Sequence, residues 1–357
     1  MKNLQTFQVV PSIPKPLHFL ETLSRNMWWC WNKDAIELFR RMDPALWAEA
    51  GRNPIFFLSK ISQRRFEKLA KDKGYLAHLK GVQEQFQSRV LDSVDRAKMS
   101  MGPGETIAYF SLEFGSHESL PVFAGGRGIL AGDHLKSAAT VNLPLTGGGL
   151  MYRHGYFRQY LNPDGWQQEA YPETDIYDLP VERVRDDAGN ELRISVIGLE
   201  GPIQAVVWKM MIGRIPLYLL DTNILENPLP YREMTSRLYA GDQKTRLAQE
   251  VLLGIGGMRV LAKLNIPVKV LHMNEGHSAF ASLERLAQTM ADQKVDLKTA
   301  LEIVPRTTVF TTHTPVAAGH DEFPAEDVLP YLKPLEEKLG TSATEILSWG
   351  QTNGSPS

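Results

Sequence analysis

The stretch that decides the fold is residues 107–167, which read IAYFSLEFGSHESLPVFAGGRGILAGDHLKSAATVNLPLTGGGLMYRHGYFRQYLNPDGWQ. It begins with an apolar, strand-like run at 107–114. The loop after this run carries Gly125, Gly126 and Gly128, and these glycines open the next segment. In that segment small or apolar residues recur at spacings of four and three, which predicts a helix: Ala131, Leu135 and Ala138.

A glycine-rich loop at the start of a helix presents backbone N–H groups that no side chain covers. The first N–H groups of a helix have no partner within the helix and lie at the positive end of its dipole. Phosphate groups and sugar hydroxyls suit such a site. We therefore expect chemistry on an anionic or polyhydroxylated substrate.

The loop differs from two common phosphate-binding motifs. A dinucleotide-binding loop reads G-x-G-x-x-G with an acidic residue about 20 positions later. Here Gly126, Gly128 and Gly132 give G-x-G-x-x-x-G, and position 148 is another glycine. A Walker loop is absent because no Gly-Lys-Ser or Gly-Lys-Thr follows. A tight turn that binds nothing remains the alternative on spacing alone.

Length and composition favour a cytoplasmic enzyme. The 357 residues suggest two domains or slightly more, and 43% hydrophobic residues are ample for their cores. A net charge of −2 argues against nucleic acid and anionic membranes as partners. The chain start lacks a continuous apolar signal, and the most apolar stretch, 251–261, is too short to span a membrane. The single cysteine, Cys30, lies among tryptophans and is expected to be a packed thiol.

The pattern along the chain predicts a helical domain at 1–100, a linker at 101–106 and an α/β domain at 107–357. Asp43 and Pro44 are typical of a helix start. Two apolar stripes at helical spacing, with a tryptophan cluster read as core, support the helical part: Leu20, Leu23, Met27, Trp31, Ala35, Leu38 and Met42, then Leu76, Leu79, Val82, Phe86, Val90 and Val94.

Two histidines follow strand-like runs. The run at 268–273 leads to Asn274 and His277, and the run at 307–312 leads to His313. In an open doubly wound sheet the ligand crevice lies outside the carboxyl ends of the parallel strands. These side chains are therefore candidates for contact with substrate.

Other chemistries have weaker support. His272 and His277 are five positions apart, not the four of H-E-x-x-H, so no metal site is predicted. A G-x-S-x-G nucleophile elbow is absent. The glycines at 253–257 lie in a helical pattern and predict close helix packing. A glycosidase stays open, because its paired carboxylates are recognised only by their separation in space: Glu113, Glu118, Asp164 and Glu169.

Ordered segments of the chain resemble one enzyme family. Residues 111–138 and 149–167 are similar to the N-terminal half of the α-glucan (glycogen or maltodextrin) phosphorylases, in the branch with an extra N-terminal helical domain. Further similar segments occur in the same order, at 26–47, 238–257, 272–280 and 309–324. The resemblance implies a two-domain, GT-B-like glycosyltransferase fold, of which this chain holds the N-terminal α/β domain preceded by a helical domain.

The resemblance also implies roles for particular residues. The glycine loop would hold the phosphate of pyridoxal 5′-phosphate, with Gly126 closest, and the substrate phosphate: Gly125, Gly126, Arg127 and Gly128. His277 matches a histidine whose imidazole binds the terminal glucose, with Asn274 and His313 beside it. The implied reaction is reversible phosphorolysis of an α-1,4-glucan or maltodextrin with inorganic phosphate, giving glucose 1-phosphate with retention. A homo-oligomer is compatible with this picture.

Two departures from the family pattern keep alternatives open. The family loop usually has leucine where this chain has Arg127, whose guanidinium could bind anions or fill the glucose subsite. Family enzymes are about twice as long, and the segment with the cofactor-binding lysine has no counterpart here, so we expect the chain alone to be inactive. The alternatives are a non-enzymatic glucan-binding or regulatory fragment and a sugar-nucleotide glycosyltransferase of the same fold.

Overall fold

The computed structural model describes residues 10–92, 101–102, 104–120, 122–239, 241–315 and 321–351. Three parts of the predictions lie outside these ranges. They are Val94 of the second apolar stripe, residue 103 of the predicted linker, and residues 316–320 of the segment at 309–324. No helix of the described residues is both long and apolar enough to cross a bilayer.

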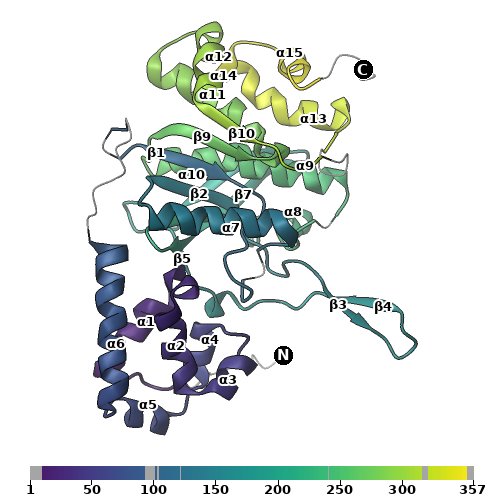
Figure 1. Ribbon diagram of the computed structural model, residues 1–357. Coiled ribbons are helices and arrows are strands. Elements are labelled where there is room, and N and C mark those ends of the chain that lie inside the picture. The colour runs from purple at the N-terminus through teal and green to yellow at the C-terminus, as the bar shows by residue number, and fades with distance from the viewer. Residues whose placement is uncertain are drawn as a thin grey trace.

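Helices come first along the described chain (Figure 1). The predicted start at Asp43 is confirmed, because its carboxylate accepts a hydrogen bond from the backbone N–H of Leu46 and Pro44 opens the helix. The first apolar stripe is divided among three short helices. The elements are η1 (Lys15–Leu17), α1 (Phe19–Ser24), η2 (Met27–Trp31), α2 (Lys33–Met42), α3 (Pro44–Glu49), α4 (Pro54–Lys60), α5 (Gln63–Leu69), α6 (Lys73–Phe86) and η3 (Gln87–Leu91).

The tryptophans form the core of this helical segment, as predicted. Trp29 is 1% exposed, and its ring packs edge-on against Phe39 and Trp47. It also contacts His117, which lies in the loop after the first strand. Burial raises the pKa of the Cys30 thiol to about 12, so this thiol is packed and stays protonated. The helical segment therefore shares one continuous core with the part of the chain that follows.

Eight of the described strands form one mixed sheet, in the order β10-β9-β1-β2-β8-β7-β5, with β6 also paired to β7. Neighbours from β10 to β8 run parallel, and the pairs that involve β7 are antiparallel. The α/β expectation is confirmed. The strands are β1 (Thr106–Phe110), β2 (Leu145–Leu150), β5 (Val181–Arg183), β6 (Arg193–Gly198), β7 (Gly201–Ile212), β8 (Ile215–Asp221), β9 (Val268–Asn274) and β10 (Thr308–Thr311).

The central strand β2 was not predicted from the sequence. Its residues are LTGGGL, and glycine is unfavourable in strands. Its neighbours supply the reason for the glycines. A Cβ added at Gly147 would lie 2.8 Å from a methyl group of Leu217, and one added at Gly148 would lie 2.5 Å from the ring of Phe110. Large side chains of the adjacent strands fill the space over both faces of β2.

Helices flank the two faces of the sheet. Tyr109 of β1 faces His134 of α7 (Gly125–Thr140), whereas the adjacent Phe110 faces Gly257 of α10 (Gly257–Lys263). The hairpin of β3 (Arg158–Leu161) and β4 (Gln167–Ala170) extends away from the sheet (Figure 1). The remaining elements are η4 (Ile176–Asp178), α8 (Leu229–Glu233), α9 (Gln243–Val251), η5 (Leu252–Gly256), η6 (Gly276–Ser278), α11 (Phe280–Gln293), α12 (Leu297–Arg306), α13 (Ala325–Leu332), η8 (Lys333–Leu335), α14 (Glu336–Leu339) and α15 (Ala343–Ser348).

Close packing explains the glycines at 253–257, as predicted. A Cβ added at Gly254 would lie 2.5 Å from the backbone nitrogen of Ala281 at the start of α11. These glycines let the helical segment approach its neighbour's backbone.

Candidate active site

The carboxyl ends of β1, β9 and β10 meet at one edge of the sheet, because β9 is paired in parallel with both of the others. This edge brings Asn274 and His313 together, since Nε2 of His313 donates a hydrogen bond to Oδ1 of Asn274 at 2.8 Å. The amide of Asn274 donates in turn to Oγ of Ser111, which follows β1. Asn274 is 0% exposed, so its amide acts as a fixed polar support for the His313 ring.

Glu275 is a site residue that sequence reasoning missed. It is fully buried and has a φ of +62°, a left-handed conformation that is uncommon outside glycine. One carboxylate oxygen accepts hydrogen bonds from the backbone N–H groups of His313 and Thr314, at 2.8 and 2.9 Å. Burial alone would raise the pKa of Glu275, but these donors lower it overall. The ionised carboxylate thus holds the loop after β10 against the end of β9.

The glycine loop opens a helix, as predicted, and its glycines serve two purposes. Gly125 and Gly126 are exposed, and a Cβ added to either would meet nothing within 4 Å. Gly128 is buried, and an added Cβ would lie 2.5 Å from Cβ of Phe123 and 2.8 Å from Oε2 of Glu113. The first two leave room for a ligand, whereas Gly128 allows the loop to pack.

Glu113 holds the glycine loop through a hydrogen bond to its backbone. Its carboxylate accepts a hydrogen bond from the backbone N–H of Ala124 at 2.7 Å and another from the hydroxyl of Tyr239. Burial raises the pKa of Glu113. This carboxyl therefore fixes the residue that precedes the helix.

Arg127 reaches from the glycine loop to the strand-end residues. Its Nη1 lies 3.1 Å from Nε2 of His277, and its Nη2 donates to Oγ1 of Thr314 at 3.2 Å. The hydroxyl of Tyr239 also lies 3.4 Å from Nη1. The glycine loop and the strand-end histidines are therefore parts of one site.

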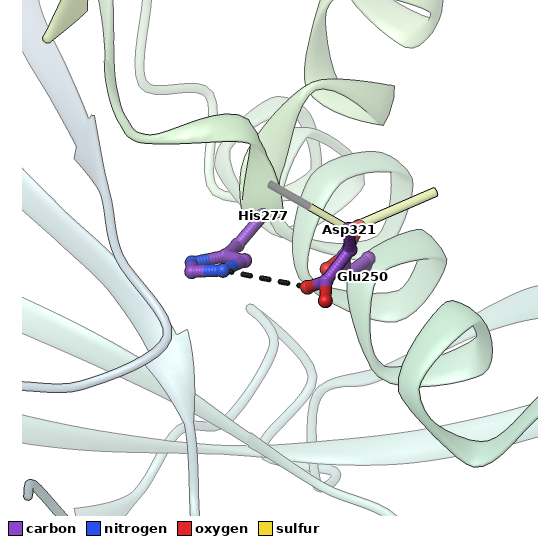
Figure 2. Close-up of side chains that lie close together, drawn as sticks. All are labelled: Glu250, His277 and Asp321. Atoms are coloured by element: carbon purple, nitrogen blue, oxygen red, sulfur yellow. Dashed lines mark ion pairs between the residues drawn. The ribbon is translucent and has the colours of Figure 1, made fainter. Parts of the chain in front are cut away.

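His277 lies in η6, directly after β9, and is only 3% exposed. Burial and the nearby cations Arg246 and Arg127 lower its pKa to about 3, so the imidazole is neutral near pH 7. Its Nε2 lies 3.5 Å from Oδ2 of Asp321, and Glu250 of α9 lies beside this pair (Figure 2). Arg246, Glu250 and Asp321 lie in two of the similar segments, 238–257 and 309–324, but no role was predicted for them, because their meeting depends on how α9 packs against the strand ends.

The four carboxylates considered for a glycosidase do not gather at the site. Glu118 pairs with Arg52, and Glu169 accepts a hydrogen bond from Tyr171 on the hairpin side. Asp164 lies in the turn between β3 and β4, away from the sheet (Figure 1). Only Glu113 contacts the glycine loop.

The architecture is that of an α/β protein with its candidate site at the carboxyl ends of parallel strands. A family model described as "Protein of unknown function (DUF3417)" matches residues 13–120. The sequence is 43% identical to a glycogen phosphorylase of Mycobacterium tuberculosis, over 97% of this chain and 41% of that protein. It is 38% identical to a maltodextrin phosphorylase of Thermococcus litoralis, over 96% of this chain and 41% of that protein.

A glycogen phosphorylase of Aquifex aeolicus is 34% identical over 94% of this chain and 48% of that protein. The chain belongs to the glycogen and maltodextrin phosphorylase family and matches its N-terminal part. It spans less than half the length of each of these three relatives.

Proposed function

We propose that this chain forms one wall of the active site of an α-glucan phosphorylase. The proposed reaction splits the end of an α-1,4-glucan with inorganic phosphate and gives glucose 1-phosphate with retention. The observation that carries the proposal is the contact of Arg127 with His277 at 3.1 Å. Because of this contact, an anion at the glycine loop and a sugar at the strand ends would lie side by side.

Each part of the site has a proposed role. The open backbone at Gly125 and Gly126 would bind phosphate oxygens. His277, held neutral by burial, would donate or accept a hydrogen bond at the glucose hydroxymethyl group. His313 has a side chain that is 26% exposed and would contact the sugar from the neighbouring strand end. Arg127 now covers the imidazole of His277, so it would have to move as the sugar enters.

Pyridoxal 5′-phosphate is the cofactor that we propose. Gly126 would lie closest to its phosphate, since the space beside this backbone is open. When bound, the cofactor would supply a phosphate that gives and takes a proton during the reaction. Its anchoring lysine is expected in the part of the relatives that this chain does not match.

The remaining organisation is proposed on the same grounds. Residues 1–100 would be a helical domain, 101–106 a linker and 107–357 the first α/β domain of a GT-B-like fold. Asn26 exchanges two hydrogen bonds of 3.0 Å with the backbone of Gly213, which fixes the helical segment against the turn between β7 and β8. We expect the protein in the cytoplasm.

Two proteins test the function: the purified 357-residue chain, and the same chain joined to the C-terminal part of the Mycobacterium tuberculosis relative. We expect glucose 1-phosphate from maltodextrin and phosphate only with the joined protein, since half a cleft lacks half of the catalytic groups. Turnover by the chain alone would contradict this. Glucan binding without turnover in the joined protein would favour a binding module, and turnover of a nucleotide sugar would favour a different glycosyltransferase.

In the joined protein, His277→Ala should lower kcat/KM by about one to three powers of ten, or about 1.5 to 4 kcal/mol. His313→Ala, which removes the histidine after the neighbouring strand β10, is compared with His277→Ala in the same assay. If His277 only satisfies buried groups, its loss would lower stability by about 1 to 3 kcal/mol and leave kcat/KM of the folded protein intact. That result would remove His277 from the substrate site.

A further inference from the structure

Two carboxyl groups lie beside His277, that of the buried Glu250 and that of the more exposed Asp321. The side chain of Glu250 is 5% exposed and that of Asp321 is 33% exposed. Oxygen atoms of both lie within 4.8 Å of each other and of a ring nitrogen of His277 (Figure 2). Two negative charges this close, one of them on a buried side chain, repel each other unless a cation or a proton is shared between them.

A metal ion is the first candidate for that shared charge, since one His and two carboxylates are common ligands. However, the guanidinium of Arg246 already provides a positive charge between the two carboxyls. Nε of Arg246 lies 3.0 Å from Oδ2 of Asp321 and 3.3 Å from Oε1 of Glu250. The guanidinium of Arg127 also contacts the imidazole, with Nη1 3.1 Å from Nε2. The positive charges of these two guanidinium groups would repel a divalent ion.

Two groups are in direct contact with the pair, Arg246 and His277. Arg246 lies on the same helix as Glu250 and covers the ring of Tyr239 at 4.9 Å. His277 comes from η6 and is contacted by Arg127 of α7, and the hydroxyl of Tyr239 donates a hydrogen bond to the carboxyl of Glu113. One guanidinium thus contacts both carboxyls, so the cluster would carry a net negative charge beside the buried Glu250 if both were ionised.

We propose that Glu250 and Asp321 share one proton and together position His277: Glu250 carries the proton and donates it in a hydrogen bond to ionised Asp321, which accepts from the Nε2–H of neutral His277. In this arrangement Asp321 fixes the tautomer of the ring and leaves Nδ1, which lies 3.2 Å from Nη1 of Arg127, as the acceptor. Glu250 and Asp321 are positioning residues, because they act on a substrate through His277. The role of that ring in catalysis rests on the proposed function, but the proton pair does not.

The acid–base properties of the three groups agree with this arrangement. Burial, and then the hydrogen bond to Asp321, raise the pKa of Glu250 to about 8. Burial would raise the pKa of Asp321 as well, but Arg246 and the hydrogen bond from Glu250 lower it overall. The less exposed carboxyl therefore holds the proton, since the charged form loses more hydration there.

The test uses the infrared band of a protonated carboxyl in the purified 357-residue chain at pH 6.5. Glu250→Gln should lower the intensity of this band, because an amide replaces the carboxylic acid with little change in shape. Glu284→Gln is the matched control, since Glu284 has a side chain with the same 5% exposure but pairs with Arg259 at 3.0 Å. The control should retain the band. A chain without the band, or a Glu250→Gln variant with the band at its original intensity, would overturn the proposal.

Nitrogen-15 NMR of the histidine rings tests the positioning. We expect the His277 ring in the Nε2–H form in the original chain and in Glu250→Gln, and a mixture of tautomers in Asp321→Asn. The Nδ1–H form in the original chain would overturn the proposal. So would a divalent ion, tested with Zn²⁺ and Mn²⁺ by equilibrium dialysis, that binds the chain and is lost in Glu250→Gln. These readouts need no turnover, so they fail or succeed independently of the proposed reaction.

Discussion

Two neighbouring glycines should respond in opposite ways to the same added methyl group. Gly126→Ala places its Cβ in open space, and because alanine favours a helix over glycine, the variant should gain about 0.5 to 1 kcal/mol in free energy of unfolding. Gly128→Ala places its Cβ 2.5 Å from Cβ of Phe123 and 2.8 Å from Oε2 of Glu113. Neither neighbour is free to move, since Glu113 holds the backbone of Ala124, so this overpacking should cost about 1 to 3 kcal/mol.

The two variants should therefore differ by about 1.5 to 4 kcal/mol, in favour of Gly126→Ala. Urea unfolding of the 357-residue chain, followed by tryptophan fluorescence, measures both free energies. Equal stabilities, or a less stable Gly126→Ala, would refute the division of the loop into open and packed glycines. The larger Gly126→Val should stay folded and weaken the binding of phosphate, which isothermal titration calorimetry measures. Unchanged phosphate binding would reject the glycine loop as an anion site.

The chain should lose stability in acid, because the folded pKa values of His277 and His117 are lowered to about 3 and about 4 while the unfolded value is 6.5. Each neutral ring then contributes stability above pH 6.5 that falls by up to about 1.4 kcal/mol per pH unit below it; urea midpoints between pH 7 and pH 5 test this, and a flat profile would contradict it. Trp29→Ala should cost about 3 to 5 kcal/mol, since this fully packed ring joins the helices to the loop after β1, and thermal unfolding against Trp29→Phe measures the loss. Asp43→Ala removes the cap on the backbone N–H of Leu46 and should cost about 1 kcal/mol in the same assay; an unchanged midpoint would show that the cap is not used.

Local patterns predicted much of the fold because they record local preferences. The strand-like run predicted at 268–273 lies within the observed β9, which continues to Asn274. The helix start at Asp43 could be predicted because the capping interaction is local: the Asp43 carboxylate accepts a hydrogen bond from the backbone N–H of Leu46. The strand β2 could not be predicted in this way. Its three glycines are explained by rings and methyl groups of strands that are distant in sequence.

The sequence by itself determined the α/β class, the glycine loop that opens a helix, and two polar strand ends at Asn274 and His313. Only the tertiary structure decided which of these residues meet. The parallel pairing of β9 with β10 brings Asn274 and His313 within 2.8 Å, and packing of α9 places Glu250 beside His277. Burial then sets the charges of these groups, because the loss of hydration depends on every segment that surrounds a side chain and not on its neighbours along the chain.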